Sequence, residues 1–310
     1  MLVSVVIPIY NEEKNLEELS KRLLDLQGNQ TTSTFEFVLV NDGSKDASYE
    51  KMLVLSQLHK SFKLINLSRN FGHQLAITAG MDHANGDACV VMDGDLQDPP
   101  EVIPQLIQKW KKGYEIVYAV REKRDGESFF KLITAKLFYR LLKKITNVDI
   151  PVDTGDFRLI DRKVLDVLKN MPEKHRFIRG MVAWSGFKST PVFYHREKRF
   201  AGTTKFTLSK MIQFSLNGIT SFSSYPLKLA STLGLIVSIS GFLYLMYVIY
   251  LALFTDRTVE GWASMMVVVL FLGGVQLLSL GVIGEYIGRI NEEVKKRPNY
   301  IIADKINFEE

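Results

Sequence analysis

The sequence has a single cysteine, Cys89, among its 310 residues, and this excludes a framework of disulfide bonds. Cys89 lies in the apolar run of residues 88–92, so we expect it to be a buried core thiol. Internal repeats and low-complexity segments are also missing from the sequence. The apolar run at residues 1–8 is too short, and too soon followed by polar residues, to be a secretory signal. We therefore expect the N-terminal region to stay in the cytoplasm.

Charge is missing from two long stretches near the C-terminus. Residues 229–254 and 262–284 contain no Asp, Glu, Lys or Arg, and each is longer than the ~20 residues that a helix needs to cross a bilayer. Buried helices of soluble proteins that reach this length almost always carry some charge. The two stretches therefore predict two transmembrane helices, and their glycines suit close helix packing.

The basic residues around these stretches predict how they are oriented. Lys residues precede the first stretch, Lys and Arg follow the second, and the intervening loop at 255–261 has one Arg against two acids. By the positive-inside rule, both flanks and both termini lie in the cytoplasm. The net charge of +5 is modest and fits contact with an anionic membrane surface.

The N-terminal part of the chain alternates apolar, β-branched runs with helical patterns. This alternation is typical of an α/β domain with a mainly parallel, Rossmann-like sheet that helices cover on both faces. The predicted strands are residues 2–9, 35–40, 62–67, 88–92, 116–119 and 187–196. The predicted helices are residues 12–26, 47–59, 74–84, 100–112, 131–144 and 161–169.

The remaining segments complete the predicted organisation. Residues 206–222 have an amphipathic pattern with basic residues at one end, which fits a helix on the bilayer surface or one packed on the soluble core. The tail at 299–310 is expected to be short and mobile, although its Ile301 and Ile302 could dock. The predicted boundaries are 1–200 for a cytoplasmic α/β domain, 201–226 for an amphipathic juxtamembrane helix, 227–288 for the two membrane spans and 289–310 for a cytoplasmic tail.

Two carboxylates one residue apart, Asp93 and Asp95, directly follow the predicted strand at 88–92. Carboxylates this close repel one another and raise each other's pKa unless a cation lies between them. They could hold a divalent cation through hard oxygen ligands and leave its other positions open for phosphate oxygens. An ordinary strand-end turn has the same sequence pattern, so the pair alone decides nothing.

Polar residues follow the other three strands as well. Tyr10, Asn11 and Glu12 follow the first strand, Asp42 follows the second and Arg69 follows the third. Each has a simpler explanation as a helix cap, a turn or a surface cation. In open α/β sheets, however, ligands bind beyond the carboxyl ends of the strands. The four strand ends together predict a nucleotide pocket with a metal site for the diphosphate.

Residues 3–12, 38–46, 67–80 and 91–101 resemble the inverting family-2 glycosyltransferases with the GT-A fold. The pattern Arg199-x-x-Gly202-x-x-Lys205 and the two apolar stretches are similar to the polyisoprenyl-phosphate glycosyltransferases of that family. Among these, the chain most resembles the bactoprenol glucosyltransferase type, which is related to dolichol-phosphate mannose synthase. The resemblance covers nearly the whole chain.

The resemblance implies partners and a location. The donor would be a nucleotide sugar, the cofactor Mg²⁺ or Mn²⁺, and the acceptor a polyisoprenyl phosphate held in the lipid bilayer. The catalytic domain would lie on the cytoplasmic face of a bacterial plasma membrane, and we expect no nucleic-acid partner. Two spans per chain, with glycines on their helices, predict a homo-oligomer, with a tetramer as one option.

Carried over residue by residue, the resemblance assigns the candidate site residues. Asp93 would lie near the ribose and the sugar, and Lys205 would act at the membrane edge. Thr204 stands where the family often has Ser, and it keeps the hydroxyl group. The full set is, for the nucleotide sugar, Pro8, Tyr10, Asn11, Glu12, Asp42, Arg69 and Asp93; for the metal, Asp93, Asp95 and Gln97; for the acceptor phosphate, Arg121, Arg199 and Lys205; and for catalysis, Asp93, Asp95 and Asp156.

The implied chemistry needs no strong general base, because the nucleophile is a lipid phosphate that is already anionic at pH 7. The metal would neutralise the departing diphosphate while arginines clamp the attacking phosphate. Asp156 would act as a base or orient the sugar, or else form an ion pair with Arg158. His73 and Arg124 could serve the site or the surface, and Trp184 could touch the sugar or lie in the core.

Other functions stay open or are disfavoured. UDP-glucose is the donor that the resemblance favours, with a mannose or an aminoarabinose donor as alternatives. A processive polysaccharide synthase would need more spans and a Gln-x-x-Arg-Trp motif, and residues 179–184 have the wrong spacing. A transporter is disfavoured because neither span carries a charge. A membrane-anchored nucleotide-sugar sensor without catalysis would not need the acceptor arginines.

Overall fold

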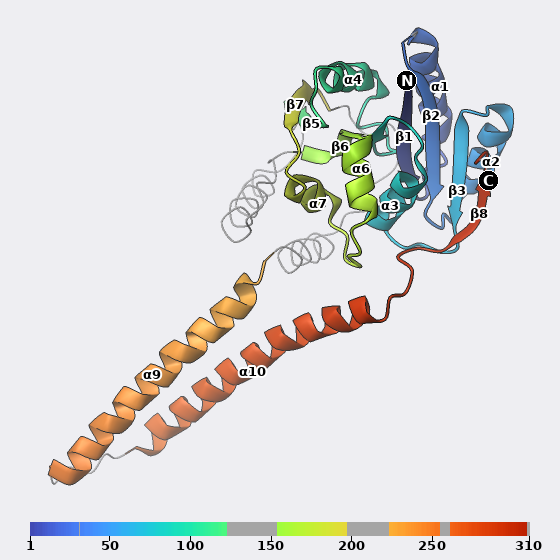
Figure 1. Ribbon diagram of the computed structural model, residues 1–310. Helices are drawn as coiled ribbons and strands as arrows, with labels where there is room; N and C mark the ends of the chain where they lie inside the picture. Colours follow the sequence, from blue (N-terminus) through green and yellow to red (C-terminus); the bar gives the residue numbers. More distant parts are fainter. Residues whose placement is uncertain (31, 123–153, 197–222, 255–260, 309–310) are drawn as a thin grey trace. The chain divides into compact units, whose positions relative to one another are not determined.

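A mixed eight-stranded sheet with flanking helices forms one compact unit of this computed structural model, and two long helices form a second (Figure 1). The structure describes residues 1–30, 32–122, 154–196, 223–254 and 261–308. Several predicted features lie outside the described residues, namely the helices at 131–144 and 206–222, Arg124, Arg199 and Lys205.

The central strands of the sheet are parallel, as predicted. In order across the sheet, the strands are β7 (Ser189–Tyr194), β5 (Ile116–Arg121), β6 (Thr154–Asp161), β4 (Ala88–Val91), β1 (Leu2–Ile9), β2 (Thr34–Asn41), β3 (Phe62–Leu67) and β8 (Ile302–Ile306). β1 pairs parallel with β2 and β4, β2 with β3, and β5 with β7. β6 and β8 run antiparallel to their neighbours, which makes the sheet mixed.

Helices cover both faces of this sheet, which also agrees with the prediction. They are α1 (Leu16–Asn29), α2 (Ser48–Leu58), α3 (His73–His83), the 3₁₀ turn η1 (Pro100–Val102), α4 (Ile103–Lys111), α6 (Arg162–Lys169) and α7 (Ile178–Trp184). α1, α2 and α4 pack on the face that carries Val5 and Ile7, and α3 packs on the face that carries Val6. A Cβ on Gly80 of α3 would lie 2.3 Å from Val6 Cγ1, so this glycine allows α3 to approach β1 closely. Cys89 is buried, as expected.

β6 is absent from the sequence-based prediction, because charged residues interrupt its apolar pattern. Asp156 and Arg158 are nevertheless buried in it, and Arg158 Nη2 donates to Gly155 O at 2.6 Å. β6 lies between β4 and β5 and runs antiparallel to both. Because Arg158 pairs with Val91, the start of β6 extends beyond the carboxyl end of β4.

The C-terminal tail is a strand of the sheet, so the expectation of a mobile tail was wrong. β8 pairs with β3, and Ser68 N donates to Ile301 O at 2.9 Å. Asp304 accepts hydrogen bonds from Asn66 Nδ2 at 2.8 Å and from Tyr49 Oη at 3.2 Å. β8 has only five residues, its sequence Ile-Ala-Asp-Lys-Ile does not alternate apolar with polar residues, and its partner strand lies far away in the sequence. No local pattern could therefore reveal the pairing.

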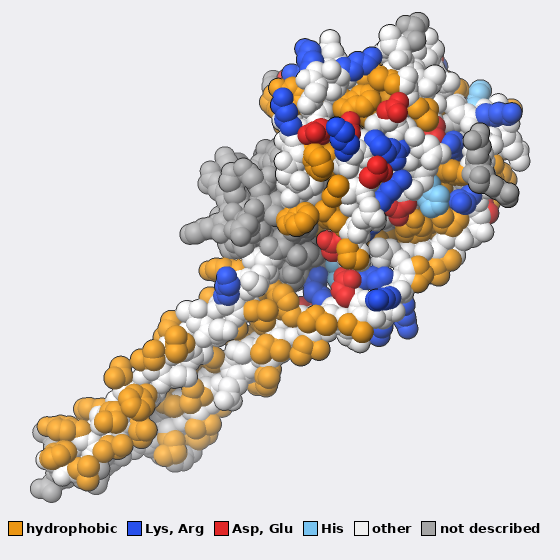
Figure 2. All heavy atoms as spheres, viewed as in Figure 1, with side chains coloured by type: hydrophobic (Ala, Val, Ile, Leu, Met, Phe, Trp, Pro, Cys, Tyr) orange, Lys and Arg blue, Asp and Glu red, His pale blue; other side chains and the backbone are white. Residues whose placement is uncertain are grey.

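Two helices of the described chain are long and apolar enough to cross a membrane. They are α9 (Tyr225–Phe254) and α10 (Trp262–Val294), which contact each other. Their apolar windows, Tyr225–Leu251 and Met265–Val294, have mean hydropathies of 2.0 and 2.4, and neither window is buried. Large hydrophobic side chains are exposed along both helices (Figure 2). A core helix of a soluble protein would bury such residues, so this exposure supports the two predicted spans.

We expect Asp304→Ala to destabilise the sheet unit by about 1–2 kcal/mol, because the change leaves Asn66 and Tyr49 without their shared acceptor. Thermal unfolding of the full chain in detergent would show a lower Tm. Asp25→Ala, at an exposed position of α1, is the matched control, and we expect it to change the stability by less than about 0.5 kcal/mol. Equal Tm values for the two variants would contradict the role of Asp304.

Candidate active site

The carboxyl ends of β1, β2, β3 and β4 meet at one edge of the sheet, as predicted. β1 and β2 end in register, because Ile9 pairs with Asn41. β6 enters the same edge from the opposite direction, and its pairing of Arg158 with Val91 brings Asp156 beside the segment that follows β4. The candidate site therefore combines residues after four parallel strands with residues at the start of an antiparallel one.

The turn after β1 is held by side chains from the turn after β2. Asn11 has a φ of 54°, its N–H donates to Ser44 Oγ at 3.0 Å, and its Oδ1 accepts from Lys45 N at 2.7 Å. Glu12 N donates to Ser48 Oγ at 2.9 Å. These contacts fix the backbone of one rim of the site. The predicted nucleoside-binding residues on this rim are Pro8, Tyr10, Asn11 and Glu12.

Asp42 is buried and ties the end of β2 to the loop after β3. Its carboxylate accepts hydrogen bonds from the backbone N–H groups of Phe71 (2.7 Å) and Gly72 (3.1 Å) and from Asn70 Nδ2 (3.0 Å). Burial raises the pKa of Asp42, while these backbone N–H groups oppose the rise. Both carboxylate oxygens are already engaged, so a nucleoside would have to share them with the loop.

Gly43 allows the two turns to approach each other. It has a φ of 65°, and a Cβ at this position would lie 2.5 Å from Asn70 N, so no other residue fits without moving the backbone. Arg69 is exposed beyond this contact, and its guanidinium stacks on the ring of Phe71 at 4.1 Å from the centroid. Arg69, which we predict to bind the nucleotide sugar, is thus held at the rim of the site by the ring of Phe71.

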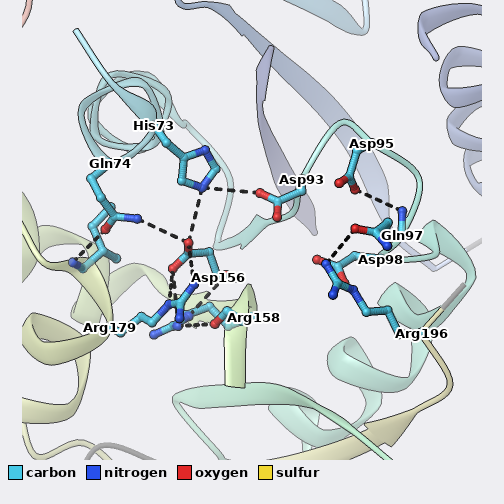
Figure 3. A network of polar contacts seen from close by, with 12 residues as sticks. His73, Gln74, Asp93, Asp95, Gln97, Asp98, Asp156, Arg158, Arg179 and Arg196 are labelled. Atoms are coloured by element: carbon cyan, nitrogen blue, oxygen red, sulfur yellow. Dashed lines mark hydrogen bonds and ion pairs between the residues drawn. The ribbon is translucent and has the colours of Figure 1, made fainter. Parts of the chain in front are cut away.

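Asp93 and Asp95 follow β4 and differ in their partners (Figure 3). Asp93 Oδ1 lies 3.4 Å from His73 Nε2 and has no hydrogen-bond partner among the described residues. Asp95 is buried, and its Oδ1 accepts from Gln97 N at 3.1 Å. Burial raises the pKa of Asp93 to about 6, with His73 opposing the rise and the carboxylate of Asp98 adding to it.

Asp156 is the centre of the polar network in Figure 3. It is 4% exposed and accepts hydrogen bonds from Arg179 Nε at 2.8 Å and Nη2 at 3.0 Å. His73 Nε2 and Gln74 Nε2 lie 3.3 Å and 3.2 Å from its Oδ2. Burial alone would raise the pKa of Asp156, but Arg179 and His73 hold it well below its usual range. The predicted ion pair with Arg158 is present but longer, at 3.9 Å.

His73, the first residue of α3, links the two acidic groups of the site. Its Nε2 lies within 3.4 Å of both Asp93 and Asp156. Partial desolvation lowers the pKa of His73, but the carboxylates of Asp93 and Asp156 raise it to about 9, which favours the imidazolium form at neutral pH. Of the two roles that the sequence left open for His73, the structure therefore favours the one in the site. Gln74 Oε1 accepts from Ile178 N at 3.1 Å and so joins α3 to α7.

Arg121, the predicted receiver of the acceptor phosphate, lies at the end of β5 next to a buried acid. Its Nη2 is 3.8 Å from Asp98 Oδ1, and its Nε donates to Tyr194 Oη at 3.3 Å. Gln97, a predicted metal ligand, accepts at its Oε1 from Arg196 Nη2 at 2.8 Å (Figure 3). The residues after Asp95 are thus tied to the end of β7.

Sequence reasoning missed Arg179 and Gln74 as members of the site. Their partner Asp156 is distant in sequence, so no motif joins them. A usable signal was the pair Asp156 and Arg158, because a charge buried in a strand requires a counter-charge from elsewhere in the fold. Trp184 is 63% exposed, which makes the core explanation for this residue wrong, and its contact with a sugar stays a prediction.

The described residues fit a divalent cation in part. Asp93 keeps a buried carboxylate oxygen without a hydrogen bond, which suits a cation with oxygen ligands. In the described ranges, however, no group of three His, Cys, Asp or Glu residues is arranged to hold an ion. A cation here would take few ligands from the protein, as Mg²⁺ does when substrate phosphates and water complete its coordination.

Two family models match the sequence. Residues 4–168 match the model described as glycosyl transferase family 2, and residues 225–290 match the model described as the GtrB C-terminal hairpin. The first match spans more than half of the chain and includes the four strand ends described above. It confirms the GT-A fold class predicted from the sequence. The second match covers most of α9 and α10.

Relatives align with nearly the whole chain. The "uncharacterized glycosyltransferase YkcC" of Bacillus subtilis (strain 168) is 56% identical over 99% of this chain and 94% of its own length. The "bactoprenol glucosyl transferase" of Shigella phage SfII is 43% identical over 97% of each chain. Among solved structures, glucosyl-3-phosphoglycerate synthase from Mycobacterium tuberculosis, in complex with Mn²⁺, UDP-glucose and phosphoglyceric acid, aligns with 69% of this chain and 76% of its own at 16% identity and a TM-score of 0.46. So distant a likeness says nothing about the ligands of this chain.

We expect Arg179→Gln to destabilise the sheet unit by about 2–3 kcal/mol, because it removes a bidentate partner from a buried carboxylate. In the double variant Arg179→Gln/Asp156→Asn the buried carboxylate that lost its bidentate partner is neutral, so thermal unfolding in detergent would show a higher Tm than for Arg179→Gln alone. Arg22→Gln is the matched control, because Arg22 pairs with the more exposed Glu101 and such pairs contribute less than about 1 kcal/mol. A double variant no more stable than Arg179→Gln would contradict this account.

Proposed function

The chain belongs to glycosyl transferase family 2, and on that premise we propose that it transfers glucose from UDP-glucose to a polyisoprenyl phosphate, with inversion at the anomeric carbon. The observation that carries the proposal is that a strand-end acidic site and a GtrB-type hairpin occur in one chain. Relatives named bactoprenol glucosyl transferase align with both parts. The product would be a β-linked lipid-phosphate sugar if the donor is α-linked.

The donor would bind at the carboxyl edge of the sheet. We assign the nucleoside to the rim formed by Tyr10, Glu12 and Asp42, with Arg69 beside the phosphates. Asp93 and Asp95 would hold Mg²⁺ or Mn²⁺, which supplies positive charge to the leaving diphosphate when it is bound. Gln97 could join them only after its Oε1 leaves Arg196. The Oδ1 of Asp93 makes no hydrogen bond among the described residues, which supports this assignment, although a cation would have to displace His73 from its position 3.4 Å away.

The reaction itself requires little proton transfer. An oxygen of the lipid phosphate attacks the anomeric carbon, the bond from that carbon to the diphosphate oxygen breaks, and UDP leaves with the bonding electrons. The attacking oxygen carries no proton that a base must remove. Asp156 suits an orienting or charge-stabilising role better than that of a base, because both its oxygens are already paired with Arg179, His73 and Gln74.

The acceptor would come from the bilayer, in which we place the hairpin of α9 and α10. Arg121, Arg199 and Lys205 are the proposed cations for its phosphate. β1 precedes α9 and β8 follows α10, yet both strands belong to one sheet. An even number of crossings is therefore required, which supports two spans with both termini on one side of the membrane. We assign that side to the cytoplasm of a bacterial cell, as the basic flanking residues predict. A homo-oligomer, with a tetramer as one option, stays part of this proposal.

Transfer assays test the proposed function directly. The full chain in detergent would be incubated with radiolabelled UDP-glucose, undecaprenyl phosphate and Mg²⁺, and the label in the organic phase counted. We expect labelled lipid, and mass spectrometry of the product to give the mass of a hexosyl phospholipid. Parallel reactions with GDP-mannose and an aminoarabinose donor distinguish the alternative sugars. Binding of UDP-glucose with no label in lipid from any donor would instead support a sensor.

We expect Asp95→Asn and Asp93→Asn each to lower kcat/KM by about 100-fold or more, because loss of an outer-shell partner alone costs metal sites up to that much. Chelation of the wild type with EDTA should abolish transfer, and Mg²⁺ or Mn²⁺ should restore it. Mn²⁺ binding in the presence of UDP, followed by electron paramagnetic resonance, provides a readout besides activity. Asp25→Asn serves as the control at an exposed site. Full activity in EDTA would refute the metal assignment.

A further inference from the structure

A second set of polar contacts lies outside the Asp156 network and ends on Arg121. Asp98 is 0% exposed, and its Oδ1 accepts a short hydrogen bond from the hydroxyl of Tyr194. The same hydroxyl accepts from Arg121 Nε at 3.3 Å, and Arg121 Nη2 lies 3.8 Å from Asp98 Oδ1. The three side chains therefore form a closed triangle in which an acid, a phenol and a guanidinium hold one another.

The backbone of the sheet sets up this triangle. Arg121 and Tyr194 are paired residues in the parallel ladder of β5 and β7, so their side chains leave the sheet side by side. A Cβ on Gly155, at the start of β6, would lie 2.8 Å from Arg121 Nη2. The guanidinium thus passes over a glycine, where any side chain would displace it.

The triangle restricts the orientation of Arg121, and it buries polar groups at a cost in folding stability. Packing of the core alone does not require these polar groups. Asp98 Oδ2 is buried with no hydrogen-bond partner in the described part of the chain, and an apolar residue would avoid that cost. Tyr194 already packs its ring edge-on against Phe157 at 5.6 Å, so Phe would fill the same space. The polar groups are therefore best explained by how they orient the guanidinium of Arg121. The Arg121 side chain as a whole is 15% exposed.

We propose that Asp98 and Tyr194 are positioning residues that fix the Arg121 guanidinium to receive the phosphate of the lipid acceptor. This inference rests on the proposed function, because it takes the acceptor to be a lipid phosphate. Asp98 stands directly after Gln97 in the segment that begins at the metal-binding carboxylates.

Steady-state kinetics of Tyr194→Phe in the full chain test the inference. The change keeps the ring and removes the hydroxyl, so we expect the KM for undecaprenyl phosphate to rise about tenfold, as loss of a hydrogen bond to a charged group predicts. The KM for UDP-glucose and the kcat should stay within about twofold. Gly155→Ala, which displaces Arg121 without touching Tyr194, should raise the same KM.

A double-mutant cycle separates positioning from general packing. In an Arg121→Ala background, Tyr194→Phe should change the KM for undecaprenyl phosphate by less than about twofold, because the group that it positions is gone. Tyr114→Phe, on the turn before β5, is the control and should change nothing. Equal tenfold effects of Tyr194→Phe with and without Arg121 would overturn the inference, as would a Tyr194→Phe variant with unchanged kinetics.

Binding without transfer distinguishes this inference from the proposed function. Farnesyl phosphate, a short lipid phosphate, would be titrated into the full chain in detergent without donor, and its Kd measured by calorimetry. Weaker binding by Tyr194→Phe than by wild type supports the positioning role even if no donor yields product, in which case only the proposed sugar transfer fails. Equal binding by both proteins, or no binding by wild type, overturns the positioning role.

Discussion

Mutual repulsion of carboxylates at one edge of the sheet is the constraint on which the site depends. After β4 and at the start of β6 the fold brings together Asp93, Asp95, Asp98 and Asp156, and the last three are buried. Asp156 is neutralised by Arg179 and His73, whereas Asp98 relies on Tyr194 and on Arg121 at a longer distance. The negative charge is thus fully compensated at Asp156 and only partly compensated at Asp98. A cation that entered such a site would relieve the repulsion between these carboxylates.

Much of the fold could be predicted from the sequence, because strand and helix periods are local properties. The parallel core of β1, β2, β3 and β4 follows from apolar runs, and the polar residues after each run follow from where parallel strands end. β6 could not be predicted by the same rule, because Asp156 and Arg158 interrupt its run of apolar residues and their side chains belong to the candidate site. β8 could not be predicted because its stability comes from a partner strand far away in the sequence.

Some residues of the candidate site could likewise be predicted from the sequence, and others could not. Asp93 and Asp95 could be found because they directly follow a strand. Arg179 could not, since its pairing with Asp156 depends on how α7 packs beside α3 and β6. Asp42 illustrates a third situation, in which the predicted role in nucleoside binding stays a prediction and the structure adds a structural role. Its carboxylate holds the loop after β3 through backbone N–H groups, so a substitution there would disturb both the loop and any ligand.

The place of β8 in the sheet also has a consequence for how the protein is made. A ribosome releases β1 to β7 first, then the two apolar helices, and only afterwards the residues that complete the sheet beside β3. Until then the edge of β3 is unpaired and open to wrong partners. The domain can acquire its last strand only after the hairpin has been synthesised. A chain whose synthesis stalls within the two helices would therefore carry a sheet without its last strand.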